Sequence, residues 1–270
     1  MVTTSPRRRS RLERRPAWGG GKLNATTIGL SPLSDADTTL IIEGVLESAA
    51  LPRETLKLLL GRVEGNPLYA EQFSELFRER GSADSMPLPE NLQGIIAARI
   101  DGLGTDEKAV LLDAAVVGKV FWSGALRRGD ADLETLLMSL TRKGFVARQR
   151  RSTVAGEDEW TFAHILLRDV AYAQIARAER SEKHRRTAEW LESLGRFEDH
   201  AAVIAYHWRA AFELARAAGQ PVTDLETPTR LALSSAGERA FAVNSDAEAA
   251  RHLEAALSLW PPTDLQQRRA

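Results

Sequence analysis

The chain of 270 residues contains no cysteine. This absence excludes disulfides, thiol catalysis and cysteine-ligated zinc, and it is typical of proteins in a reducing compartment. No uninterrupted apolar stretch approaches the length of a membrane-spanning helix, and the first residues lack the apolar core of a secretory signal. We therefore expect a cytoplasmic protein with no membrane partner.

A strong charge of one sign is also missing, because the formal net charge is −1. No global field therefore attracts nucleic acid or a membrane surface. The charge is uneven, since residues 1–22 hold many basic side chains against only Glu13. Such basic starts occur in RNA-binding arms and in transit peptides, but a solvated, ragged beginning is the simpler interpretation.

The motifs that catalysis requires are absent too. Gly19-Gly20-Gly21-Lys22 is not a Walker A loop, because Leu23 stands where serine or threonine would bind magnesium and Pro16 stands at the first glycine position. A glycine turn before a strand at residues 25–30 explains it better. No His-Glu-x-x-His or Gly-x-Ser-x-Gly motif occurs, so the sequence predicts no catalytic residue and no metal ligand. The five histidines are interpreted as surface or packing residues.

Helix signals dominate what is present. Ser34, Pro52 and Asn66 each predict the start of a helix. Asn66 is a good N-cap, and Pro67 after it is a preferred first helical residue. Apolar residues at helical spacing follow, and Gly81 is a stop signal. The three helices are expected to form a small helical lid. Taken alone, the Gly-Asn-Pro sequence is only a turn and a cap.

A polar linker that contains proline, residues 82–89, separates this lid from a second region with three helix signals and two strand signals. The helices are expected near 90–101, 105–117 and 131–143, and the strands at 145–149 and 159–162. Thr105 and Asp130 are the expected caps of the second and third helices. Three helices followed by a β-hairpin make the winged-helix arrangement.

A winged helix suggests DNA binding through its third helix. The start of that helix carries three carboxylates, those of Asp130, Asp132 and Glu134. Because phosphate neutralisation supplies most of the affinity for DNA, these carboxylates oppose binding. Opposite charges across the hairpin are expected to pair and to cancel the field there. The two sets are Arg148, Arg150 and Arg151 on one side and Glu157, Asp158 and Glu159 on the other.

From residue 178 onward the pattern is that of amphipathic helices without strands. They are expected at 181–194, 198–218, 224–243 and 246–259, before Pro261-Pro262. Small alanines at packing positions make them similar to tetratricopeptide (TPR) hairpins, whose arrays need several repeats to bury a continuous core. With about two hairpins the array is expected to be cut short. Leu253, Leu257 and Trp260 should then be exposed, which favours protein partners or self-association.

Four segments occur in an order that resembles one family. They are residues 17–33, Gly-Asn-Pro-Leu-Tyr-Ala-Glu-Gln-Phe at 65–73, Ala-Ala-Val-Val-Gly-Lys-Val-Phe-Trp at 114–122, and residues 162–172. Together they resemble the STAND class of AAA-like signalling P-loop ATPases, in the bacterial form joined to a class III adenylyl or guanylyl cyclase domain or to a transcriptional output domain. The chain resembles the carboxyl-side portion, without the phosphate-binding half.

The resemblance implies a mainly α chain with five parts. They are the basic start and the last strand of the ATPase sheet at 1–33, the helical lid at 34–81, a linker at 82–89, a winged-helix domain at 90–177 and a truncated TPR-like arm at 178–270.

The resemblance also implies a nucleotide-facing set. Pro67 would lie under the adenine, with Gly65 and Asn66 shaping the turn. His164 matches the histidine of the family's Met-His-Asp motif, which touches the diphosphate, although the residues on either side differ here. As plain structure, a single histidine at a strand-to-helix junction is a capping or packing residue. Arg8 is one candidate for the sensor arginine.

The leading prediction is therefore a non-catalytic regulatory segment that closes over ATP or ADP with magnesium in an intact ATPase and relays its state to an output. The chain alone is expected to hold no cofactor. Its expected partners are an ATPase core, in the same polypeptide or separate, and proteins that bind the helical arm. Two alternatives remain: a winged-helix DNA-binding regulator, opposed by the acidic third helix, and an ATP-binding or ATP-hydrolysing protein, opposed by the missing phosphate loop.

Overall fold

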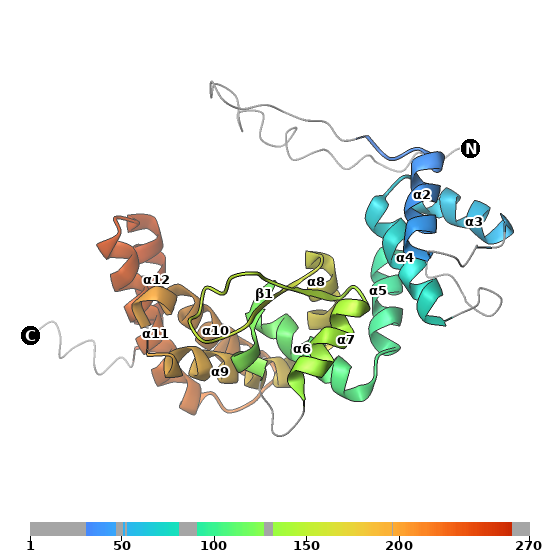
Figure 1. Ribbon diagram of the computed structural model, residues 1–270. Coiled ribbons are helices and arrows are strands. Elements are labelled where there is room, and N and C mark those ends of the chain that lie inside the picture. The colour runs from blue at the N-terminus through green and yellow to red at the C-terminus, as the bar shows by residue number, and fades with distance from the viewer. Residues whose placement is uncertain are drawn as a thin grey trace, which may run out of the picture.

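A computed structural model describes residues 31–46, 51, 53–80, 91–126, 132–195 and 197–260. These residues are mainly helical, with one small antiparallel sheet of three strands. Figure 1 shows three groups of elements that follow one another along the molecule. We call them the N-terminal helical group (α2–α4), the sheet group (α5–α8 with the sheet) and the C-terminal helical group (α9–α12). Each contains its own buried apolar core.

The N-terminal helical group begins where local capping signals predict. Its helices are α2 (Asp35–Leu46), α3 (Arg53–Val63) and α4 (Pro67–Arg80). The Ser34 hydroxyl accepts a hydrogen bond from the Asp37 amide at 3.1 Å, so Ser34 caps α2. The Asn66 side chain accepts one from the Tyr69 amide at 3.2 Å, and α4 begins at Pro67 as expected.

The sheet group contains one strand that the sequence analysis did not predict. Its elements are α5 (Leu92–Asp101), α6 (Thr105–Val117), β1 (Val120–Trp122), the 3-10 helix η1 (Ser123–Leu126), α7 (Leu133–Arg142), β2 (Val146–Arg148), β3 (Glu159–Phe162) and α8 (Ile165–Gln174). The strand order is β1-β3-β2, with Phe121 opposite Trp160 and Ala147 opposite Thr161. With three residues, β1 is too short to show an alternation of apolar and polar residues in the sequence. It is a strand because it pairs with β3.

Two of the expected helix caps are wrong. Gly104, rather than Thr105, precedes the first helical residue of α6, and the Glu107 carboxylate accepts a hydrogen bond from the Gly104 amide at 3.0 Å. Asp132 caps α7 through the amide three residues further on, at 3.2 Å. Asp130, the expected cap, lies outside the described residues. Several residues of cap-forming type stand close together at both starts, so sequence alone did not choose between them.

The C-terminal helical group is a row of four helices. They are α9 (Arg177–Ser193), α10 (Phe197–Ala217), α11 (Thr223–Ala242) and α12 (Asp246–Ser258), and each packs against the next. As expected, Leu253 and Leu257 of α12 are 38% and 53% exposed. Trp260 departs from the expectation, because its side chain is half-buried and the Arg230 guanidinium lies 4.4 Å from the centre of its ring.

Several expectations concern parts of the chain that the structure does not describe. They are the basic start with Arg8, the strand at 25–30, the linker at 82–89 and Pro261-Pro262. In the described part, no helix is both long enough and apolar enough to cross a membrane.

Helix α5 joins the first two groups because it contributes to both cores. Ile95 packs into the core of the N-terminal helical group, whereas Ile96 and Ile100 pack into the core of the sheet group. Arg99, between them, is only 1% exposed. A buried charge of this kind is tolerated only where its donors are satisfied.

The contacts of Arg99 come from both groups. From α4, the Glu79 carboxylate accepts two hydrogen bonds from the guanidinium at 2.8 and 3.1 Å, and the Gln72 side chain accepts a third. From the end of α7, the Lys143 carbonyl accepts another, and the guanidinium lies 4.5 Å from the centre of the Phe145 ring. One side chain therefore fixes α4 against the sheet group.

We predict that Arg99→Ala lowers the free energy of unfolding by about 3 kcal/mol, because it leaves the buried Gln72 side chain, the Glu79 carboxylate and the Lys143 carbonyl without their shared partner. The measurement is urea unfolding followed by circular dichroism. The matched control is Arg78→Ala, which removes an arginine that pairs with Glu75 but is 42% exposed; that change should cost less than about 1 kcal/mol. Equal losses in the two variants would contradict the assigned role of Arg99.

Candidate functional site

The Gly65-Asn66-Pro67 turn has a backbone that only glycine fits. Gly65 has a φ of +70°, in the left-handed region where glycine carries no steric penalty. Its carbonyl accepts a hydrogen bond from the Leu33 amide at 2.9 Å. A Cβ at this position would lie 2.4 Å from the Leu33 carbonyl oxygen and 2.7 Å from its amide nitrogen. The turn is therefore held against the segment before α2, while Pro67 is exposed.

His164 is the N-cap of α8. Its Nδ1 atom accepts a hydrogen bond from the Leu166 amide at 3.1 Å, and its side chain is exposed. This geometry is that of the capping alternative. Among the described residues, no hydrogen bond, ion pair or ring contact joins His164 to the Gly65-Asn66-Pro67 turn.

The charges of the β2–β3 hairpin pair only in part as expected. Arg148 and Asp158 form an ion pair at 2.6 Å. Glu157 instead accepts a hydrogen bond from the Gly124 amide at 2.7 Å. Glu159 is buried and accepts hydrogen bonds from the Thr153 hydroxyl and amide at 2.6 and 2.8 Å. Glu157 therefore binds η1, and Glu159 binds the chain that follows β2, rather than arginines across the hairpin.

Hydrogen bonding also acts on the pKa of the Glu159 carboxyl. Burial by itself raises the pKa of the Glu159 carboxyl, but hydrogen bonds from Thr153 and from the Trp122 indole hold that pKa below its ordinary value.

At the start of α7, Asp132 and Glu134 are exposed. These two carboxylates are therefore at the surface of the described structure.

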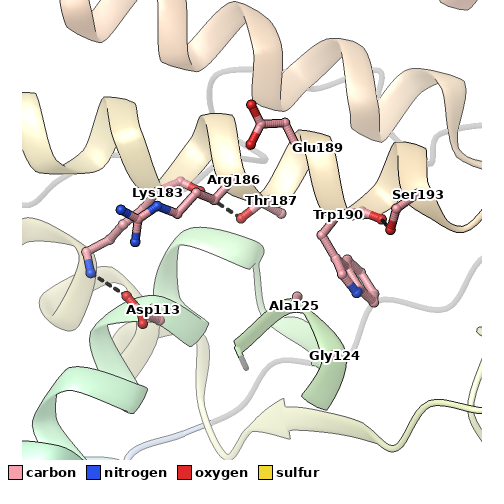
Figure 2. A pocket seen from close by; sticks show the side chains of 9 residues that line it. All are labelled: Asp113, Gly124, Ala125, Lys183, Arg186, Thr187, Glu189, Trp190 and Ser193. Carbon is pink, nitrogen blue, oxygen red and sulfur yellow. Dashed lines mark hydrogen bonds and ion pairs between the residues drawn. The ribbon is translucent and has the colours of Figure 1, made fainter. Parts of the chain in front are cut away.

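A pocket of about 410 Å³ lies where α9 meets α6 and η1. Figure 2 shows Lys183 and Asp113 at one end of it and Trp190 at the other. The charged residues at the pocket have protein partners: Lys183 pairs with Asp113, Arg186 with Glu182 at 2.8 Å, and Glu189 with Arg185. The pocket is thus part of the junction between two groups, and its charged side chains already have partners within the protein.

Two features of this junction were not visible in the sequence. Asp113 and Lys183 are both buried and lie 70 residues apart in the chain. The Trp122 and Trp190 rings stack with their centres 5.8 Å apart, which joins the sheet to α9. No sequence motif links either pair, since only the packing of α9 against α6 and β1 brings them together.

A second polar cluster lies at the same junction. His184 of α9 and His207 of α10 are 0% and 1% exposed, in agreement with their interpretation as packing residues. Their Nδ1 atoms lie 2.8 Å apart. Burial, together with the charges of Arg168 and Arg180, lowers the pKa of His184 to about 4. Burial, together with His184 and Arg168, lowers the pKa of His207 to about 3, although a hydrogen bond to Val117 opposes the shift.

Comparison with known proteins finds no family model that matches the chain. The chain is similar to an uncharacterized protein, R02095, of Rhizobium meliloti (strain 1021), with 27% identity over 234 residues. The match covers 74% of this chain but only 21% of that protein, so the chain spans about a fifth of its relative's length.

We predict that Gly65→Ala lowers the free energy of unfolding by about 2 kcal/mol or more, because alanine there is strained and its Cβ meets the Leu33 backbone. The control is Gly61→Ala in α3, where a Cβ meets nothing within 4 Å. This control should be stabilised by up to about 1 kcal/mol, since alanine is the better helix former. Thermal unfolding of the two variants compares them, and a tolerated alanine at position 65 would show that the turn is not constrained.

Proposed function

We propose that the chain is a non-catalytic regulatory segment of a nucleotide-dependent signalling ATPase. In this proposal the N-terminal helical group is the lid, the sheet group is a winged-helix domain, and the C-terminal helical group is a TPR-like arm. The ATPase core belongs to the same polypeptide or to a partner, and the nucleotide is ATP or ADP with magnesium. The output is a cyclase or a transcriptional domain.

The turn before α4 is the observation that supports this proposal most directly. The tight approach of Gly65 to Leu33 holds the turn in place, and the exposed Pro67 is free to meet a planar base. Asn66, whose side chain caps the helix, serves the turn rather than a ligand. His164 is exposed at the start of α8, where a helix N-terminus favours a negatively charged group.

The contacts between groups supply the relay that such a segment requires. Arg99 binds Gln72 and Glu79 of α4 together with the end of α7, so a displacement of α4 acts on the sheet group. Lys183 and Asp113 then connect α6 to α9. These contacts connect α4 with the sheet group and the sheet group with the C-terminal helical group.

The proposal predicts that the isolated chain shows no saturable micromolar binding of labelled ATP with magnesium, because no phosphate loop is present. In the protein that includes the loop, Pro67→Ala should weaken ATP binding about tenfold, equivalent to about 1.4 kcal/mol. The control is Pro221→Ala, an exposed proline in the C-terminal helical group.

Two results would contradict this proposal. One is saturable ATP binding by the isolated chain, which would favour the ATP-binding alternative. The other is an ATPase that contains this segment and binds nucleotide equally well with and without Pro67.

The proposal also predicts that the purified chain does not shift duplex DNA at physiological salt. The exposed carboxylates of Asp132 and Glu134 stand at the end of α7 that would approach the phosphates. Fluorescence anisotropy with a labelled duplex measures the binding. Strong binding that weakens steeply with added salt would instead support the DNA-binding alternative.

A further inference from the structure

Four helices meet at one buried chain of hydrogen bonds. The Tyr172 hydroxyl of α8 lies 2.9 Å from His184 Nε2 of α9, and His184 Nδ1 lies 2.8 Å from His207 Nδ1 of α10. His207 also bonds the backbone of Val117 at the end of α6. This cluster, Tyr172–His184–His207–Val117, crosses from the sheet group to the C-terminal helical group.

The hydrogen-bond partners assign the protons in this cluster. The Val117 carbonyl can only accept, so His207 donates to it from Nε2, because its Nδ1 faces His184. His207 Nδ1 is then an acceptor in the neutral ring, and His184 donates from Nδ1. His184 Nε2 in turn accepts from the Tyr172 hydroxyl. Two neutral rings in different tautomers therefore satisfy every ring nitrogen.

An added proton has no place in this arrangement. If His207 gains a proton at Nδ1, two N–H groups face each other across 2.8 Å. If His184 gains one at Nε2, the Tyr172 hydroxyl must reverse and lose its acceptor. Both histidine rings are buried, so water cannot replace a bond that a ring nitrogen loses while the helices stay packed.

The surrounding charges also oppose an added proton. Arg168 of α8 and Arg180 of α9 lie 4.7 and 4.6 Å from the centre of the Tyr172 ring. Asp113 is the carboxylate that α6 places at this junction, and it forms an ion pair with Lys183. From α10, the Tyr206 ring lies 5.7 Å from the His184 ring.

We propose that the His184–His207 pair is a pH-sensitive joint, in which acidification releases α9 and α10 from α6 and α8. The joint is closed at neutral pH, when both rings are neutral, and opens when the pair takes up a proton. This inference concerns the isolated chain and does not depend on the proposed nucleotide function.

The sign of the pH effect follows from the lowered pKa values. A histidine with an ordinary pKa of 6.5 takes up a proton in the unfolded chain, whereas His184, with a pKa of about 4, stays neutral in the folded one. Its contribution to stability is therefore complete above pH 6.5 and is lost as the pH falls from 6.5 towards 4. Between pH 7 and pH 5 one such group raises the unfolding equilibrium constant about 20-fold.

The test uses the full chain at pH 7 and pH 5. Hydrogen exchange followed by mass spectrometry, corrected for the intrinsic effect of pH, should show protection lost first in peptides from α8, α9 and α10. Urea unfolding should show the 20-fold change or a larger one. In His184→Gln/His207→Gln, which removes both titrating rings, most of the change should disappear.

The matched control is His252→Gln, because His252 lies on α12 and faces Glu248 rather than the cluster. This variant should keep the pH dependence of the original chain. If the double variant does not fold, His207→Gln alone retains a donor for Val117 and should still reduce the pH dependence. Unchanged exchange of α9 and α10 between pH 7 and pH 5 in the original chain would overturn the proposal, as would full pH dependence in the double variant.

Discussion

The burial of the Arg99 guanidinium constrains the rest of the described structure. A charged group leaves water only where other groups replace its hydration. Arg99 obtains these partners from α4 on one side and from the end of α7 on the other. Because the guanidinium is planar and its donors point in fixed directions, the two groups can meet in only a narrow range of orientations.

The junction between the sheet group and the C-terminal helical group follows the same principle. Apolar contacts there are supplemented by Trp122, which packs against both cores. The Lys183–Asp113 pair and the His184–His207 pair then place buried polar groups that have partners only in one arrangement. Two apolar surfaces can slide past each other at little cost, whereas a shift that leaves a buried polar group without its partner costs free energy. Both junctions therefore fix the orientation of the groups that they join as well as stabilising them.

These junctions give the proposed regulatory role a physical route. The exposed Pro67 starts α4, and the same helix carries Gln72 and Glu79, the partners of Arg99. A ligand that moves the start of α4 therefore acts directly on a buried contact rather than on a flexible surface. In the proposed role, the polar clusters further along the chain would pass this displacement to α9 and α10.

The sequence by itself determined the elements whose signals are local. Asn66 and Pro67 set the start of α4, and the apolar periodicity placed α9 to α12 close to their observed bounds, because caps and helix faces depend on residues three or four positions apart. It also identified β3.

Only the tertiary structure decided the rest: strand β1 exists through its pairing with β3, and Glu159 is held by Thr153 and Trp122 rather than by arginines. Lys183 pairs with Asp113, which is 70 residues away in the sequence, and His184 contacts His207, which is 23 residues away. The sequence contains no periodic pattern that predicts contacts at such separations, because they form only when helices pack and bury their polar side chains against one another.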